Sequence, residues 1–274
     1  MPLYKILSVV VFLPLISFGV YAKELPLWEL GLGAGALHQS YYTGTKQTRS
    51  YAFPVVLGVY RGEFLKSDDK GIRAQLFKDE RFKLDLSFDF NFAVDSDEID
   101  LRQGMDDIGS LLEVGPSLEV KLFESESNKW FLRFPLRGVM EIDDGEFSTA
   151  GYNFSPSIAL EKKFLGTSWK TGASIAFKFG DQKYNSIYYS VDPEFATTDR
   201  EAYQADSGYA GSRLQLSLTS KSSKNLLVFF LRYDDISGAV YDDSPLVETK
   251  SNTTVGVLYT RYIFKSKRFV NRDE

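Results

Sequence analysis

The feature that most constrains the fold is a strictly alternating stretch of sequence between residues 82 and 94. Every second residue is large and apolar, and the residues between them are polar or small. The apolar members are Phe82, Leu84, Leu86, Phe88, Phe90, Phe92 and Val94. A period of two is typical of a β-strand and not of a helix. The stretch is about twice the usual strand length of five or six residues, and about ten tilted residues are needed to cross a bilayer.

Shorter alternating stretches follow along the rest of the chain. They begin at Trp130, Tyr152, Trp169, Leu214 and Leu227, and a last one places Leu258, Thr260, Tyr262 and Phe264 on one face. Upstream, residues 27–37 and 51–60 form a first hairpin, and residues 63–66 and 72–77 form a shorter one. The pattern predicts an all-β fold, a transmembrane antiparallel up-and-down β-barrel. It would have about 12 strands, or about 10 if the short hairpin lies outside the wall.

Composition agrees with a barrel wall and argues against other classes of protein. The chain has no Cys, one His and a net charge of −5, so neither a zinc site nor a nucleic-acid partner is expected. Aromatic residues make up 15% of the chain, yet its mean hydropathy is only −0.20. Lipid-facing and lumen-facing residues alternate in a barrel wall, which keeps the mean hydropathy modest while aromatic residues collect at the interfaces.

Residues 1–22 have the parts of a secretory signal peptide. Lys5 supplies the positive start, residues 6–20 are almost wholly apolar, and a small residue, Ala22, offers the cleavage site. Cleavage there removes Lys5 and changes the net charge from −5 to −6. The chain is therefore expected to be exported, with residues 23–264 forming the barrel and residues 265–274 a charged periplasmic tail.

The connections between the predicted strands alternate between short and long. Residues 124–128, 165–167 and 221–224 are tight polar turns. Residues 94–110, 143–150, 180–208 and 236–251 are longer and are acidic or rich in Tyr. Barrels of the bacterial outer membrane have short periplasmic turns and longer extracellular loops. The expected location is therefore the cell outer membrane, with lipid and lipopolysaccharide around the wall and both termini in the periplasm.

Charged residues fall opposite the apolar face on several predicted strands. They are Glu119, Lys121, Arg133, Arg137, Glu141, Glu161, Lys163, Lys170 and Lys178. Inside a barrel such charges either pair and hold the wall together or line a water-filled channel that selects ions. Both interpretations stay open from the sequence.

Catalytic and metal-binding candidates are weak. His38 and Ser40 share one face of a strand, as a base and a nucleophile must, but no flanking motif supports catalysis. Five Asp-Asp pairs occur at 68–69, 106–107, 143–144, 234–235 and 242–243, without the ligand spacing of a calcium loop. Solvated turn residues are the preferred interpretation of these pairs. No catalytic residue, metal or cofactor is predicted, and the chain is not expected to be an enzyme.

A Tyr-rich segment between residues 184 and 209 is the favoured contact site on the outer side. Tyr188, Tyr189 and Tyr203 are the candidates, because Tyr is enriched at interfaces. The same segment could also fold inward and plug the barrel mouth. A periplasmic partner would instead meet residues 61–62, 78–81, 124–128 and the tail.

Several short blocks give the chain a resemblance to the MipA/OmpV family. The clearest block is residues 112–118. The others include residues 41–44, 60–62, 84–87, 95–96, 102–107, 181–184, 188–191, 205–209 and 244–247, and their order and spacing carry the resemblance. The individual positions that match are Tyr60, Arg61, Gly62, Asp85, Arg102, Gly104, Met105, Glu113, Gly115, Pro116, Tyr184, Gly208, Tyr209 and Pro245.

The resemblance implies an outer-membrane scaffold named for its interaction with the lytic transglycosylase MltA. In that family interpretation the barrel links a lytic transglycosylase to a peptidoglycan synthase, so that wall cutting and wall building stay coupled. The alternative function is a channel for small solutes, or a surface-loop barrel for adhesion or stress response. Periodicity and composition predict only the barrel, because a fold does not determine a function.

Overall fold

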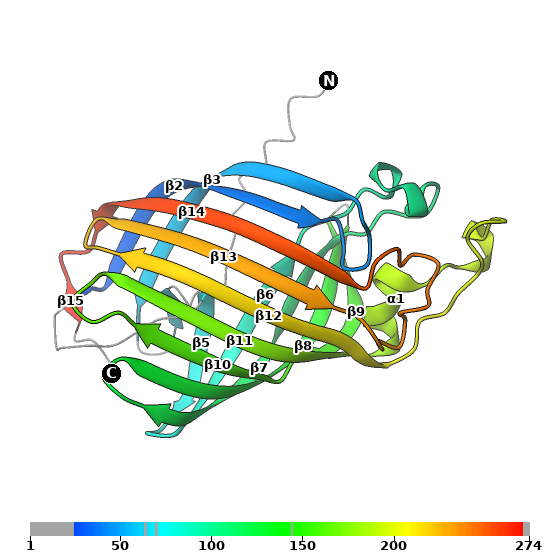
Figure 1. The fold of residues 1–274 in the computed structure, drawn as a ribbon. Coiled ribbons are helices and arrows are strands. Elements are labelled where there is room, and N and C mark those ends of the chain that lie inside the picture. The colour runs from blue at the N-terminus through cyan, green and yellow to red at the C-terminus, as the bar shows by residue number, and fades with distance from the viewer. Residues whose placement is uncertain (1–24, 63–64, 69–70, 144, 271–274) are drawn as a thin grey trace.

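The computed structural model describes residues 25–62, 65–68, 71–143 and 145–270. The predicted signal peptide lies outside the described residues. The chain forms one antiparallel sheet that closes on itself as a barrel (Figure 1). Its strands are β2 (Trp28–Ser40), β3 (Thr48–Arg61), β4 (Leu65–Asp68), β5 (Gly71–Lys78), β6 (Phe82–Asn91), β7 (Ser110–Glu124), β8 (Asn128–Asp143), β9 (Glu146–Phe154), β10 (Ser157–Lys163), β11 (Trp169–Gly180), β12 (Gly208–Lys221), β13 (Asn225–Asp235) and β14 (Ser251–Lys265).

Each strand pairs with its neighbour in sequence, and β14 closes the barrel by pairing with β2. Strands β9 and β10 both lie between β8 and β11, so they are two parts of one strand that is interrupted at Ser155 and Pro156. Pro cannot donate to a ladder, which explains the break. Counted this way the barrel has 12 strands, and the short hairpin β4–β5 belongs to the wall. The predicted up-and-down barrel is confirmed.

The two faces of the wall differ as the alternation predicts. The outward residues of β12 and β13 include Leu214, Leu216, Phe229 and Leu231, which are large, apolar and exposed. The residues between them, such as Arg213, point inward and form ion pairs across strands. The exposed apolar band is the surface that lipid covers in a transmembrane barrel.

The two ends of the barrel also differ. At one end, here called the turn end, the connections 125–127, 164–168 and 222–224 are short. At the other, here called the loop end, lie the connections 41–47, 92–109, 181–207 and 236–250. Three short 3-10 helices, η1 (Ser96–Glu98), η2 (Asp100–Arg102) and η3 (Pro193–Phe195), and the helix α1 (Gln182–Tyr189) belong to these loops. No helix in the described part of the chain is long and apolar enough to cross a membrane.

One predicted loop is wrong. Residues 143–150 were expected to form a long connection, but β8 continues to Asp143 and β9 resumes at Glu146. Gly145 has a positive φ of 86°, which a tight hairpin turn requires. Because the turn is so short, the two strands extend the wall at this point.

The two ends of the described chain meet at the turn end. Residues Leu25–Pro26 form β1 and residues Phe269–Val270 form β15, and these two short strands pair antiparallel. Figure 1 shows β15 at the opposite end of the barrel from α1. A register shift between Tyr262 and Phe264 precedes this point. It turns Phe264 outward, so the prediction that Phe264 shares a face with Tyr262 is wrong.

Candidate functional site

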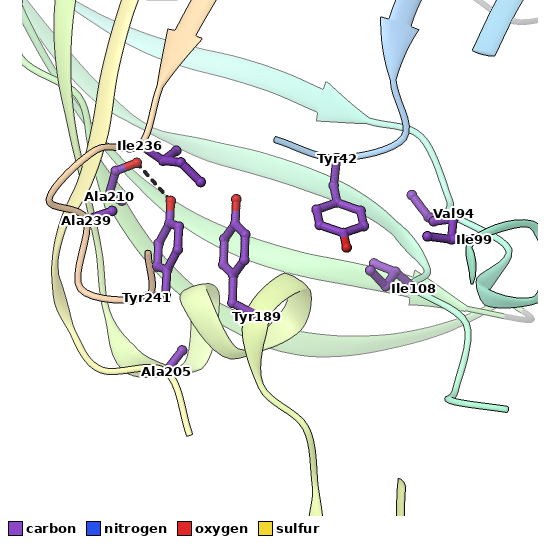
Figure 2. Close-up of a cluster of buried hydrophobic side chains, with 10 residues drawn as sticks. All are labelled: Tyr42, Val94, Ile99, Ile108, Tyr189, Ala205, Ala210, Ile236, Ala239 and Tyr241. Carbon is purple, nitrogen blue, oxygen red and sulfur yellow. Dashed lines mark hydrogen bonds between the residues drawn. The ribbon is translucent and has the colours of Figure 1, made fainter. Parts of the chain in front are cut away.

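At the loop end, residues from all four long loops and Ala210 of β12 form one cluster of buried side chains. They are Tyr42, Val94, Ile99, Ile108, Tyr189, Ala205, Ala210, Ile236, Ala239 and Tyr241. Figure 2 shows the rings of Tyr189 and Tyr241 side by side above α1, with Tyr42 facing Val94, Ile99 and Ile108. We call this cluster the plug. Its members are far apart in sequence, so it forms only when the loops fold over the barrel mouth.

Tyrosine hydroxyls tie the loops of the plug together. The rings of Tyr189 and Tyr241 stack with centroids 3.6 Å apart, and Tyr42 meets Tyr189 edge-on at 6.2 Å. Tyr42 donates to the carbonyl of Leu246 at 2.7 Å, and Tyr189 donates to the carbonyl of Thr43 at 2.7 Å. Burial raises the pKa of Tyr42, Tyr189 and Tyr241. The plug is therefore built from neutral tyrosines.

Asp181 positions α1 beneath the loops. Its carboxylate accepts from the Tyr184 N–H at 2.9 Å, which caps the helix, and from the Tyr152 N–H at 3.0 Å, which ties the cap to β9. A Cβ on Gly151 would lie 2.2 Å from the same carboxylate oxygen, and Gly151 has a φ of 94°. Only glycine leaves room for this cap.

Arginines join the loop 92–109 to the loop 181–207. Arg102 is 3% exposed and donates to the Ser96 hydroxyl at 3.0 Å and the Asp106 carbonyl at 3.1 Å. Arg200 reaches across from the second loop and donates to the carbonyl of Leu101 at 2.7 Å. Burial lowers the pKa of Arg102, although the side chain stays charged because Arg starts from such a high pKa. These bonds hold both loops in place over the barrel mouth.

Beneath the plug lies a cavity of about 220 Å³. Its charged lining residues come from seven strands of the wall and are Arg49, Asp89, Glu113, Arg137, Lys178, Arg213, Arg232 and Asp234. Asp234 forms ion pairs with Arg213 at 2.7 Å and with Arg232 at 3.0 Å. Asp234 is 2% exposed. The prediction of a solvated turn residue at Asp234 is therefore wrong.

Glu113 is the second anionic centre of the cavity. It accepts from the Asn153 amide at 2.8 Å, from the Asn91 amide at 3.1 Å and from the Tyr184 hydroxyl at 3.3 Å. Arg137 lies 3.6 Å from both Glu113 and Asp89. The carboxylate of Glu113 therefore connects Tyr184 of α1 to the wall of the barrel.

The charges predicted for the lumen all lie on the inward face, and most of them have partners. Arg133 pairs with Glu119 at 2.7 Å and with Glu161 at 3.1 Å. Lys121 pairs with Glu124 at 2.6 Å. Glu141 accepts from the Gly109 N–H at 2.8 Å. Lys163 and Lys170 lie nearer the turn end, and Lys178 lines the cavity. Asp89, Arg213, Arg232 and Asp234 were not among the predicted lumen charges, although their period-two positions could have revealed them.

An apolar region on the inner surface was also missed. Val55, Leu226, Val228 and Leu258 are buried together, and Phe53 packs against them. Glycines face this region from the neighbouring strands. A Cβ on Gly256 would lie 2.1 Å from the ring of Phe230, and one on Gly35 would lie 2.6 Å from the ring of Phe53. The inner surface therefore has a charged side and an apolar side.

Most of the positions that carry the family resemblance lie at one of the two ends of the barrel. Arg102, Gly104, Met105, Glu113, Tyr184, Gly208, Tyr209 and Pro245 lie at the loop end or beneath it. At the turn end, Arg61 pairs with Glu29 and donates to the Pro26 carbonyl at 2.6 Å, with Tyr60 and Gly62 beside it. Asp85 pairs with Lys83 on the inner wall. A Cβ on Gly115, next to Pro116, would lie 2.0 Å from the Leu136 carbonyl oxygen, so only glycine fits.

The tyrosines proposed for outward contact have another role. Tyr189 is 5% exposed and belongs to the plug, and Tyr188 packs against it from below. Tyr203 is half-buried and donates to Asp243 at 2.6 Å. The favoured outward contact site is therefore wrong for Tyr189, and the inward-folded alternative describes this segment.

His38 and Ser40 do not form a catalytic pair. His38 shares a hydrogen bond of 2.9 Å with the Ser50 hydroxyl, while the Ser40 hydroxyl accepts from Asn252 at 2.6 Å. Among the described residues nothing donates to or accepts from the second ring nitrogen of His38, so a group that orients a base is missing there. The described residues also contain no cluster of three or more His, Cys, Asp or Glu that could hold a metal ion.

The chain matches one protein-family model and is similar to several solved structures. The sequence model of the family described as MltA-interacting protein MipA matches residues 31–264. A search of curated proteins found no significant match. Among solved structures, a bacterial polysaccharide outer membrane secretin has a TM-score of 0.47 and 9% identity, covering 86% of this chain and 99% of its own. An outer membrane channel from Pseudomonas putida F1 has a TM-score of 0.40 and 11% identity, covering 90% and 100%.

A toluene transporter from Pseudomonas putida is also similar, with a TM-score of 0.36 and 8% identity, covering 86% of this chain and 88% of its own. The family match spans nearly the whole described barrel, from β2 to β14. The chain therefore belongs to the MipA family, and it is an outer-membrane β-barrel.

Proposed function

We propose that this barrel is a non-conducting scaffold that binds enzymes of peptidoglycan metabolism at its turn end. Members of the MipA family are generally non-catalytic outer-membrane proteins, and the family is named for an interaction with MltA. The observation that supports a scaffold over a channel is the plug, because four packed loops close the mouth through which a solute would pass. In this proposal the turn end faces the periplasm, where a lytic transglycosylase and a peptidoglycan synthase would dock.

The charge of the turn end suits such a docking role. Exposed cations there are Lys78, Arg81, Lys162, Lys224, Arg261, Lys265, Lys267 and Arg268. Exposed anions among the described residues of this end are fewer, namely Asp79, Glu80, Glu124 and Glu126. A basic rim of this kind steers association with an acidic surface on a partner. The pairing of β1 with β15 adds a folded element to the same rim.

Charge reversal at the rim tests the docking proposal. We expect Lys267→Glu with Arg268→Glu to weaken capture of a purified lytic transglycosylase by the refolded barrel, and to reduce the salt dependence of what remains. The matched control is Lys46→Glu with Lys183→Glu, two exposed cations at the loop end. Equal binding by both double variants would contradict docking at the turn end.

A solute channel is the second candidate, and the charged cavity favours it. Single-channel recording in a planar bilayer separates the two functions. The scaffold proposal expects insertion without conductance steps. Steady steps that scale with salt concentration would show that the plug opens, and they would favour the channel.

A further inference from the structure

The barrel wall has a seam between β3 and β6. Strand β3 is long, but its described pairing with β4 covers only Tyr60 and Arg61. Strand β6 pairs with β5 only as far as Ser87. Above the short β4–β5 hairpin, towards the loop end, residues 50–56 of β3 and 88–91 of β6 therefore have no strand paired to these two edges, among the residues that the structure describes. We call this stretch the seam.

The direction of the backbone hydrogen bonds shows which groups face the seam. The Tyr41 N–H donates to the Gln47 carbonyl, and the Arg61 N–H donates to the Leu27 carbonyl. Backbone groups of alternate residues point to opposite edges of a strand. The odd-numbered residues of β3 therefore bond to β2, and the backbone groups of Ala52, Pro54 and Val56 point into the seam.

Strand β6 presents its own free edge in the same way. The Lys121 N–H donates to the Arg81 carbonyl, so the odd-numbered residues of β6 bond to β7. The backbone groups of Phe88 and Phe90 consequently point into the seam. The Phe90 N–H donates to the carboxylate of Asp89 at 2.9 Å instead of to a strand. On the opposite edge Pro54 has no N–H, which removes a donor that would otherwise be unpaired in the membrane.

The cavity reaches this seam. Its lining includes Arg49 at one edge and residues 89–92 at the other. Phe90 is among them, although its side chain is on the outward face and is 39% exposed. Among the described side chains, those at the loop end of the seam come together: the rings of Tyr51 and Phe92 lie 6.4 Å apart, and Arg49 donates to the Ala93 carbonyl at 3.4 Å. Below these contacts the inside of the barrel approaches the lipid-facing surface.

The charged residues that line the cavity indicate which kind of ligand would bind there. Five cations and three anions line it, and Asp234, Glu113 and Asp89 are already engaged with arginines. Arg49 and Lys178 have no carboxylate within ion-pair distance among the described residues. The buried Nε of Arg49 also has no hydrogen-bond partner there. Two cationic groups are thus available to an anion that reaches the cavity.

We propose that the seam is a lateral portal through which the barrel binds an anionic amphipath with an acyl chain. The head, a carboxylate or phosphate, lies between Arg49 and Lys178, and the chain lies across Phe90 and Phe92 towards the bilayer. A partner strand is a poorer occupant of the same edge, because Pro54 blocks strand pairing there.

Photo-crosslinking in vesicles tests the portal. The barrel is reconstituted into zwitterionic phosphatidylcholine vesicles with a diazirine-bearing palmitate, irradiated, and mapped by mass spectrometry. We expect labels on Tyr51, Phe92 and inward residues near Lys178. Excess palmitate should compete, whereas hexadecanol and inorganic phosphate should not. If phosphate alone competes as well as palmitate, the site binds a free anion and the portal is wrong.

Two cross-strand partners provide a matched pair of variants. Ala36 and Ala52 face each other on β2 and β3, and both side chains are outward and exposed, but only Ala52 borders the seam. We expect Ala52→Trp to suppress labelling of the inward residues and Ala36→Trp to leave it unchanged. Equal labelling in both variants would show that the ligand enters through an end of the barrel, and the portal would be wrong.

A head-group variant keeps the test decisive if Ala52→Trp fails to fold. Lys178→Gln should weaken palmitate competition about tenfold, as expected when a charge-assisted contact is lost. Lys170→Gln is the control, since Lys170 is on the inward face of the same strand outside the cavity. Equal competition in both Lys variants would overturn the assignment of the head-group site.

Discussion

The two ends of this barrel differ in how their side chains pack and in the charges that they expose. The loop end buries tyrosines and aliphatic side chains from four loops in one plug. The turn end has short connections and an exposed basic rim. The loop surface is also acidic, with exposed cations only at Lys46, Lys183 and Lys250 among the described residues of its loops. The packed plug and the acidic loops therefore lie at one end of the barrel, and the basic rim lies at the other.

This difference shows where stability and recognition should be found. Removing one ring from the plug lowers its stability, because the remaining side chains cannot fill the space. An exposed charge at a rim contributes little to folding, although it guides association. Changes at the loop end should therefore open the barrel, while changes at the turn end should alter binding without unfolding it.

The largest effect is expected for Tyr189→Ala. This change removes the ring stacked on Tyr241 and the bond to the Thr43 carbonyl, and it should cost the plug about 3 kcal/mol. Limited proteolysis should then cut the long loops, and conductance steps should appear. Tyr152→Ala is the control, because Tyr152 is 64% exposed on the outside of the wall. If the long loops of Tyr189→Ala stay protected from protease, changes at the loop end do not open the barrel and the proposed difference between the two ends is wrong.

A smaller effect is expected for Gly151→Ala, measured against Gly145→Ala by thermal unfolding. Both glycines have a positive φ, so each alanine should cost about 1 kcal/mol in backbone strain. Only at Gly151 would the new methyl meet the carboxylate that caps α1, which should add about 1 kcal/mol. Equal destabilisation would mean that the Asp181 cap does not hold α1 under the plug.

The smallest effect is expected from a change of pH, which should act on the tyrosines of the plug. Little should change near neutral pH, and the plug should weaken only at high pH. Because their pKa values are raised by burial, folding favours their neutral form. Their stabilisation is complete below the ordinary tyrosine pKa of about 10, and it is lost as the pH rises towards the folded-state values. Protease sensitivity of the long loops should therefore rise above about pH 10, together with tyrosinate absorbance. Loops that open between neutral pH and the ordinary tyrosine pKa would contradict this origin.

The wall could be predicted from the sequence because the residues that define each strand are close together in the chain. Alternation within residues 82–94 is enough to separate a lipid-facing row from an inward row, and Arg133 and Glu119 follow from the same period. The hairpin at Gly145 was not predictable in this way. Its acidic and glycine residues are typical of a loop, and only the pairing of β8 with β9 shows that the strands continue.

The plug could not be predicted because its contacts are distant in sequence. Tyr42 bonds to the Leu246 carbonyl across most of the chain, and nothing near either residue indicates that the two meet. The seam was hidden for a related reason. Residues 48–61 have the pattern of an ordinary wall strand, and the free edge becomes visible only when the length of β4 is known.

The pairing of β1 with β15 has a consequence for how this molecule is made. The first and last strands of the wall, β2 and β14, are also neighbours, so the barrel is closed by the pairing of these two strands. A nascent polypeptide that lacks its final segment has no partner for β2 and remains an open sheet. The β2 edge of such a truncated chain would expose backbone donors and acceptors that the complete barrel satisfies.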